Sequence, residues 1–154
     1  MNEYHLKEVK KRDEKLVCEL LQVWQKSVEA THLFLTEKDV YELIPYVKMG
    51  IMGIETLIIV QSQDIKVVGF MGIEKEKIEM LFLHPDFFRR GIGTGLVNYA
   101  IRKCKVTSVD VNEQNPQAYE FYLSVGFKVE SRSELDEQGR AFPILHLKLE
   151  EQSC

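Results

Sequence analysis

The sequence predicts a mixed α/β fold, because short apolar segments typical of strands alternate with segments whose apolar residues recur every three or four positions. Residues 78–83 form an apolar run that Pro85 ends, as expected for a buried strand. Residues 96–104 then carry apolar side chains at helical spacing. Because the chain of 154 residues has no internal repeat, linker or low-complexity tract, we expect residues 1–150 to form a single domain and residues 151–154 a short tail.

The N-terminal part of the chain is predicted to hold a weak strand and two helices. Asp13 is a typical N-cap, and the apolar residues behind it form a helical stripe that ends near Val28. Thr36 is predicted to cap the second helix, which has acidic residues in its first turn. Pro45 lies inside that helix and is a point where it could split into two short ones. The predicted order is a strand within 3–10, a helix at 13–28, a connection at 30–35 and a helix at 36–48.

The rest of the chain is predicted to consist mainly of strands joined by turns. The charged residues 74–77 are typical of a hairpin turn. Asn115 followed by Pro116 is a helix start, since proline has no N–H to leave unpaired there. Gly126 is the expected C-terminal cap of that helix. Strands are predicted at 56–61, 66–73, 78–83, 107–111, 127–130 and 144–149, and helices at 96–104 and 116–125.

The composition limits the classes of function. Lys plus Arg number 20 and Asp plus Glu 24, so the formal net charge is −4, whereas sequence-independent nucleic-acid binding requires a basic surface. No apolar run approaches the ~18–20 residues that a membrane-spanning helix needs. The N-terminus does not resemble a signal peptide, and Cys18, Cys104 and Cys154 have no paired spacing. We therefore expect a cytoplasmic protein with reduced thiols and with neither nucleic acid nor membrane as a partner.

The segment that follows the buried strand has the composition of a phosphate-binding turn. Gly91, Gly93 and Gly95 let backbone N–H groups approach a ligand without a Cβ in the way. A helix that begins behind such a turn offers unpaired N–H donors and partial positive charge. Arg89 and Arg90 add fixed charge. This chemistry predicts a phosphate-bearing ligand at the end of the strand.

Two segments resemble the signatures of a known family. The segment from Leu81 to Leu96 resembles the acetyl-CoA-binding motif of the GNAT superfamily of N-acetyltransferases, a strand followed by Gln/Arg-x-x-Gly-x-Gly/Ala and a helix. The segment from Asn112 to Phe127 is similar to the family's second signature, Asn-x-x-Ala…Phe-Tyr-x-x-x-Gly-Phe. The C-terminal half looks closest to the bacterial acetyltransferases of the YjaB type. Phe88 stands out as a departure, at a position where the motif has Gln or Arg.

The resemblance implies a central, mostly antiparallel mixed sheet flanked by helices, with acetyl-CoA as cosubstrate. It implies an acyltransferase that moves acetyl directly to a primary amine in a ternary complex. By this resemblance, the backbone of 81–83 pairs with the pantetheine amides, N–H groups of 89–94 hold the pyrophosphate, and the Asn115 side chain binds the pantetheine arm. Tyr122 would protonate the departing thiolate. The implied cofactor-binding residues are Leu81, Phe82, Leu83, Arg89, Arg90, Gly91, Ile92, Gly93, Thr94 and Asn115.

Further residues are candidates for the acceptor side of the reaction. By strand alternation Glu79 shares a face with Leu81 and Leu83, so it is a candidate to accept the amine's proton, with a chain of water molecules as the alternative. His32 and Phe34 lie between the first two helices, which in the family flank the acceptor site. They are candidate substrate contacts or, equally, parts of a surface loop. No group of His, Cys and Asp has metal-ligand spacing, so no metal is expected.

Two other functions are compatible with the sequence. A CoA-binding sensor or partner protein would keep the fold without turnover, and a nicotinamide-dependent enzyme would place Asp110 at a ribose. The glycines read Gly-x-Gly-x-Gly rather than Gly-x-Gly-x-x-Gly, which favours CoA over NAD. The acceptor stays open between small-molecule amines, such as a polyamine or aminoglycoside, and lysine in a peptide. We expect a monomer or a homodimer, in which the last strand, residues 144–149, could pair across the interface.

Overall fold

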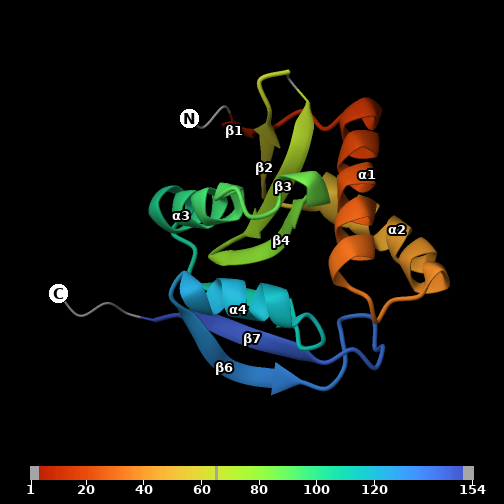
Figure 1. Cartoon of the computed structure of the whole chain (residues 1–154), viewed down its shortest axis with the longest axis vertical. Coiled ribbons are helices and arrows are strands. Elements are labelled where there is room, and N and C mark those ends of the chain that lie inside the picture. Colours follow the sequence, from red (N-terminus) through yellow and green to blue (C-terminus); the bar gives the residue numbers. More distant parts are fainter. Residues whose placement is uncertain (1–3, 65, 151–154) are drawn as a thin grey trace.

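A twisted β-sheet forms the centre of the molecule in the computed structural model, which describes residues 4–64 and 66–150 (Figure 1). Within these residues its seven strands run in the order β1-β2-β3-β4-β5-β7-β6, and all neighbours are antiparallel except β4 and β5. The elements are β1 (His5–Glu8), α1 (Glu14–Thr31), α2 (Glu37–Gly53), β2 (Thr56–Gln61), β3 (Val67–Glu74), β4 (Lys77–Leu83), the 3₁₀-helix η1 (Pro85–Phe87), α3 (Ile92–Cys104), β5 (Ser108–Asn112), α4 (Pro116–Ser124), β6 (Phe127–Ser133) and β7 (Ile144–Leu149).

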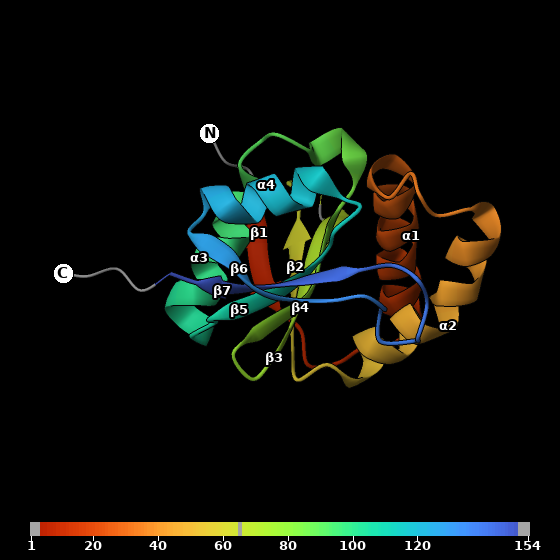
Figure 2. The same ribbon diagram turned by 90° about the horizontal axis from the view of Figure 1, so that it is seen from below.

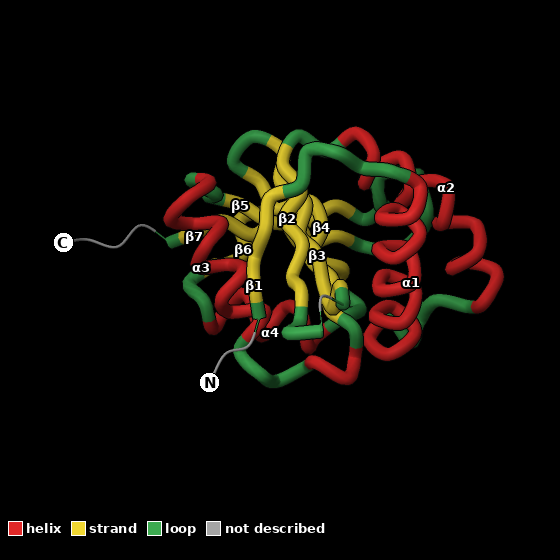
Figure 3. The backbone as a smooth tube through the Cα atoms, turned by 90° about the horizontal axis from the view of Figure 1, so that it is seen from above, coloured by secondary structure: helices red, strands yellow, loops and turns green. Residues whose placement is uncertain are grey.

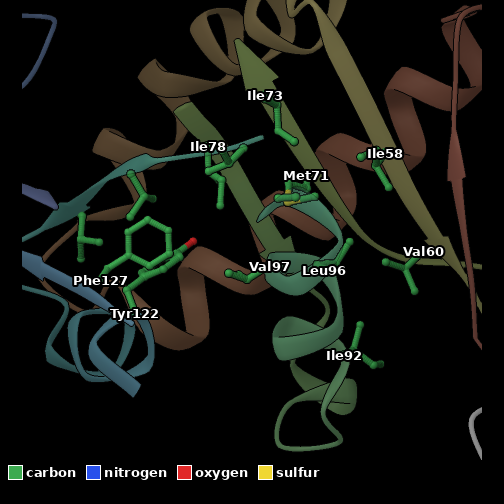
Figure 4. Packing of buried hydrophobic residues seen from close by; sticks show 14 of the residues in the cluster. Ile58, Val60, Met71, Ile73, Ile78, Ile92, Leu96, Val97, Tyr122 and Phe127 are labelled. Atoms are coloured by element: carbon green, nitrogen blue, oxygen red, sulfur yellow. The ribbon is translucent and has the colours of Figure 1, made fainter. Parts of the chain in front are cut away.

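The helices cover both faces of the sheet. Helices α1 and α2 lie on one side, and α3 and α4 lie on the other (Figures 2 and 3). Leu96, Val97 and Tyr122 pack from α3 and α4 into one hydrophobic core (Figure 4). Leu20 of α1 packs with Phe70 of β3 in a second core on the opposite face. The predicted architecture, a mostly antiparallel mixed sheet flanked by helices, is confirmed.

The sheet opens between β4 and β5. These strands pair in parallel through Lys77 with Ser108 and Ile78 with Val109, and through no further residues of the described chain. Strand β4 continues to Leu83 while β3 remains paired along its other edge. The edge of β4 that faces β5 therefore carries backbone N–H and C=O groups without a neighbouring strand.

A β-bulge lies at Glu79 in β4. Ile78 and Met80 pair with successive residues of β3, so Glu79 has no residue opposite it. As a result, Ile78 packs in the same core as Leu81 and Leu83, whereas Met80 packs in the core on the other face. Strict alternation would have put Ile78 and Met80 together. Glu79 was predicted to share a face with Leu81 and Leu83 on the assumption of strict alternation along β4. The bulge breaks that alternation at Glu79 itself.

The helix starts agree with the prediction, but the end of α1 does not. The Asp13 carboxylate caps α1, and Thr36 and Asp39 form a reciprocal capping box at the start of α2. Helix α1 continues through Thr31, so it extends two residues into the connection predicted at 30–35. The Thr31 hydroxyl donates to the Ser27 carbonyl at 2.8 Å, which supports the last turn.

Helix α2 is continuous from Glu37 to Gly53, so the possible split at Pro45 does not occur and the helix outlasts its predicted end near residue 48. Proline removes one backbone hydrogen bond, and the carbonyl that loses its donor belongs to Tyr41, four residues earlier. Tyr41 is 76% exposed, so water can replace that donor. The cost of the proline is therefore low enough for the helix to continue.

The position of β7 corrects the predicted dimer contact. Strand β7 lies between β5 and β6 and is hydrogen-bonded along both edges, so it cannot pair across an interface. The edge strands of the sheet are β1 and β6. The tail predicted at residues 151–154 lies outside the described residues. None of the described helices is both long enough and apolar enough to cross a membrane.

Candidate functional site

A cavity of about 1050 Å³ lies where β4 and β5 separate. Its walls come from β4 and β5, from the segment after α1, from the first turns of α3 and α4, and from the loop between β6 and β7. Twelve of the fourteen residues predicted for the site line it, although they come from distant parts of the chain. They are His32, Phe34, Glu79, Leu81, Phe82, Leu83, Arg89, Gly91, Gly93, Thr94, Asn115 and Tyr122, and the two others are Arg90 and Ile92.

The N-terminus of α3 has the features of an anion-binding turn. Gly91, the N-cap, has φ of 79° and supplies no side-chain cap. Helices α1, α2 and α4 each have a side-chain cap, so α3 differs from them in leaving its first N–H groups open. Arg89 lines the cavity beside this turn. A Cβ on Gly93 would lie 3.2 Å from Cζ of Phe121, so this glycine permits the close approach of α3 and α4.

Arg90 and Ile92 can offer only their backbones to this turn. Nη1 of Arg90 lies 3.2 Å from the Tyr4 hydroxyl, and its guanidinium lies 5.1 Å from the centroid of the Phe87 ring. Ile92 is 6% exposed and packs in the core beneath α3. The predicted fixed charge thus lines the cavity through Arg89 and not through Arg90. That residues 89–94 act through backbone N–H groups stays a prediction.

Phe88 occupies the Gln/Arg position when the motif is counted from Gly91, the N-cap of α3. Its side chain lines the cavity, so an aromatic residue stands there in place of a polar one. Arg89, the next residue, also lines the cavity. Whether Arg89 or backbone N–H groups replace the missing polar contact stays a prediction.

Tyr122 is a largely buried residue whose hydroxyl faces the cavity. Its ring is 6% exposed and packs edge-on against Phe121 and Phe127, at centroid distances of 5.0 and 5.8 Å. Figure 4 shows the hydroxyl at the end of the ring remote from α4. It makes no hydrogen bond to another described residue and is not among the buried polar atoms that lack a partner, so the oxygen is accessible from the cavity. Burial raises the pKa of Tyr122, so the hydroxyl keeps its proton at neutral pH.

Asn115 and His32 form a directional hydrogen-bond chain between α4 and α1. The Ala118 N–H donates to Asn115 Oδ1 at 3.3 Å, and Asn115 Nδ2 lies 3.5 Å from His32 Nε2. His32 Nδ1 lies 2.8 Å from the Thr31 hydroxyl, which itself donates to Ser27 O. The hydroxyl must therefore accept from Nδ1–H, which leaves Nε2 as the acceptor for the Asn115 amide. This chain fixes Asn115 and requires a neutral His32.

The neutrality of His32 leads to a testable dependence of stability on pH. Burial lowers its pKa from 6.5 to about 4. Between these values the unfolded chain binds a proton that the folded protein does not, so stability falls as pH drops from about 6.5 to 4. We expect urea unfolding of the wild-type protein to lose about 2 kcal/mol more than a His32→Gln variant between pH 7 and pH 5. Parallel losses in the two proteins would contradict this account.

A cluster of polar side chains that the sequence analysis did not assemble lines the opposite part of the cavity. Lys77 Nζ lies 2.6 Å from Asp110 Oδ2 and 3.7 Å from Glu79 Oε1. His146 Nδ1 lies 2.7 Å from Asp110 Oδ1, and His146 Nε2 lies 2.6 Å from the Ser133 hydroxyl. The sequence pattern that could have indicated Asp110 is the alternation of polar with apolar residues in β5. Val109 and Val111 face the core, and Asp110 faces away from it.

The charges in this cluster act on one another. Burial raises the pKa of Glu79, and the nearby Glu137 and Asp110 carboxylates raise it further against the opposing effect of Lys77. Burial alone would lower the pKa of Lys77, but its hydrogen bond and ion pair with Asp110 outweigh burial and raise it. Glu79 is therefore disposed to take up a proton, whereas Lys77 stays charged.

Two further contacts complete the acceptor side. Oδ1 of Asn112, on β5, is buried in the cavity wall without a hydrogen-bond partner among the described residues. The ring of Phe34 lies between His32 and Phe142, with both centroids 5.4 Å away. A buried acceptor atom without a donor costs stability unless a ligand or water supplies one.

The nicotinamide alternative is not supported by this arrangement. Asp110, its predicted ribose ligand, is already bound to Lys77 and His146. The mostly antiparallel sheet also lacks the doubly wound parallel topology in which such an acid meets a ribose. Within the described residues, no group of three or more His, Cys, Asp or Glu side chains is arranged to hold a metal.

Comparison with known proteins identifies the family. Residues 21–147 match the model of the acetyltransferase (GNAT) domain. The chain is 40% identical over 128 residues to the peptidyl-lysine N-acetyltransferase YjaB of Salmonella typhimurium, which covers 83% of this chain and 88% of that protein. It is 39% identical over 129 residues to YjaB of Escherichia coli K12, with 84% and 87% covered.

Solved structures agree with the sequence matches. The solution structure of apo-form YjaB from Escherichia coli superimposes with a TM-score of 0.84 and 34% identity, over 95% of this chain and 97% of that one. The PaiA N-acetyltransferase from Thermoplasma acidophilum, solved with coenzyme A, shares the fold at a TM-score of 0.68 and 22% identity, over 94% and 99% of the two chains. The chain therefore belongs to the GNAT family and is an N-acetyltransferase that uses acetyl-CoA.

Proposed function

We propose that residues 1–150 act as a single domain that acetylates the side-chain amine of lysine in a peptide or protein. The observation that carries this proposal is the single cavity shared by the open turn of α3, the Tyr122 hydroxyl and the carboxylates of Glu79 and Asp110. A cationic side chain is attracted to such a wall. The names of the relatives at 39–40% identity, peptidyl-lysine N-acetyltransferases, support the same acceptor class.

Acetyl-CoA is proposed to bind along the open edge of β4. The backbone groups of 81–83 on that edge have no strand partner beyond Ile78, so they can pair with the pantetheine amides as an added strand. The N–H groups of 89–94, with the Arg89 side chain, would hold the pyrophosphate. Asn115 would bind the pantetheine arm from its fixed position at the start of α4.

Two residues are proposed to handle protons during transfer. Tyr122 would donate its proton to the departing sulfur; burial keeps the hydroxyl protonated and also disfavours a free thiolate, so the sulfur leaves as a thiol. Glu79 would accept a proton from the amine, directly or through water, as its raised pKa favours. Acyl transfer then needs no covalent acyl-enzyme.

The free cysteines bear on the cellular setting. Cys18 and Cys104 are free thiols, which suit a reducing compartment, so we propose a cytoplasmic enzyme. A homodimer, if formed, would use an edge strand, and a monomer is equally compatible with the fold.

The proposal is tested by mass spectrometry of the acetylated product. Purified protein is incubated with acetyl-CoA and either an internal-lysine peptide with a blocked N-terminus or spermidine. We expect faster acetylation of the peptide. Faster acetylation of spermidine would reject the lysine acceptor while leaving the enzyme class intact. Calorimetric titration with acetyl-CoA, and with NAD as the comparison ligand, should give one site per chain for acetyl-CoA alone.

A further inference from the structure

If the acceptor is a lysine, as in the function proposed above, its ammonium must lose a proton before the nitrogen can attack the thioester. A lysine enters as an ammonium and leaves as an amide, so its nitrogen loses two protons. One is balanced by the proton that Tyr122 gives to the CoA sulfur, and the other is released to solvent. Glu79 can hold only one proton at a time. A second acceptor on the same wall would allow the ammonium to be deprotonated first.

Ser133, His146 and Asp110 form a continuous hydrogen-bonded series on three adjacent strands. Ser133 ends β6, His146 lies in β7, and Asp110 lies directly opposite His146 in β5. The distances are 2.6 Å from the Ser133 hydroxyl to His146 Nε2 and 2.7 Å from His146 Nδ1 to Asp110 Oδ1. All three side chains line the cavity that Tyr122 and Glu79 also line.

The roles within this series follow from the available donors. A carboxylate can only accept, so Nδ1 of a neutral His146 carries the hydrogen that Asp110 accepts. Nε2 is then an acceptor, and the Ser133 hydroxyl donates to it. The Ser133 oxygen keeps lone pairs for a donor in the cavity. An ammonium at that oxygen can pass one proton to Ser133 while the hydroxyl proton passes to Nε2, which leaves a neutral amine and an imidazolium facing Asp110.

We propose that His146 takes the first proton of the acceptor ammonium through Ser133, with Asp110 as the residue that orients the imidazole. The neutral amine then attacks the thioester carbon, the carbon–sulfur bond breaks, Tyr122 protonates the sulfur, and Glu79 takes the second proton from nitrogen. The proton on Glu79 then restores the Tyr122 hydroxyl through water, and His146 releases the first proton to solvent. Glu79 and His146 thus act in succession.

The surroundings of His146 suit a reversible proton acceptor. Lys77 lies 2.6 Å from the other oxygen of Asp110, so the carboxylate is shared between two cations when His146 is protonated. The charged groups on this wall are Asp110 from β5, Lys77 and Glu79 from β4, and Asp136 and Glu137 from the β6–β7 loop, with neutral His32 from the end of α1.

The test is the pH dependence of kcat/KM for the lysine peptide in wild-type protein and in His146→Gln. At pH 7 about one lysine amine in 2500 is neutral, and at pH 9.5 about one in nine. The variant is expected to lose roughly 100-fold in kcat/KM at pH 7. Because about one amine in nine already arrives neutral at pH 9.5, the loss should shrink to about tenfold or less there, with the affinity for acetyl-CoA unchanged throughout.

Companion variants separate this role from a structural one. Ser133→Ala should show a smaller loss with the same pH dependence, whereas Glu79→Gln should lose activity at both pH values because it acts after attack. Ser131→Ala is the matched control, since Ser131 lies opposite His146 in β6 but its side chain makes no hydrogen bond to the imidazole. An equal loss in His146→Gln at pH 7 and 9.5, or no loss at pH 7, would overturn the proposal. Wild-type protein without lysine-peptide activity would instead reject the proposed function.

Discussion

Tyr122→Phe is expected to lower kcat by roughly 100-fold or more while the affinity for acetyl-CoA stays within about twofold. The substitution removes only the hydroxyl, and the ring keeps its edge-on contacts with Phe121 and Phe127. No hydrogen bond to another described residue is lost, so the free energy of unfolding should not fall. The rate of CoA release measures kcat, and calorimetric titration with acetyl-CoA independently measures the affinity.

Tyr119→Phe is the matched control, because Tyr119 lies in the same helix but does not line the cavity. Its kcat should equal that of the wild-type protein. If Tyr122→Phe retained full activity, another group would have to protonate the sulfur. If the wild-type protein bound acetyl-CoA but transferred acetyl to no amine tested, the CoA-binding sensor would become the better description.

Much of the fold could be predicted because its signals are local. The strands at Thr56–Gln61 and Ile144–Leu149 were predicted with their observed bounds, since apolar periodicity and turn residues define both ends. The caps at Asp13 and Thr36 likewise depend on side chains within three residues. The residues proposed to bind the cofactor could be predicted for the same reason, because most of them lie in one contiguous segment, residues 81–96.

The acceptor side could not be predicted, because it depends on strand order. Lys77, Asp110, Ser133 and His146 lie on four strands, and they meet only because β7 is inserted between β5 and β6. Alternation indicates which face of a strand is polar but not which strand lies beside it. The bulge at Glu79 was equally hidden, since it appears only when β4 is paired with β3.

Gly93→Val is expected to weaken acetyl-CoA binding by roughly 10- to 100-fold. A Cβ at this position would already lie 3.2 Å from Phe121 and 3.9 Å from Leu83, and two further methyl groups must displace one of them or enter the cavity. Overpacking of this kind costs about 1–3 kcal/mol, and each 1.4 kcal/mol is about tenfold in affinity. Because Phe121 packs on Tyr122, displacement would also move the hydroxyl and reduce kcat.

Gly95→Ala provides the contrast two residues further along α3. A Cβ there meets no atom within 4 Å, and alanine is favoured over glycine in a helix by up to about 1 kcal/mol. We expect this variant to bind acetyl-CoA as the wild-type protein does and to melt at the same or a higher temperature. Calorimetric titration measures the affinity of both variants for acetyl-CoA, and thermal unfolding measures their melting temperatures. Equal loss of affinity in the two would mean that the flexibility of the turn, rather than the space beside Phe121, governs cofactor binding.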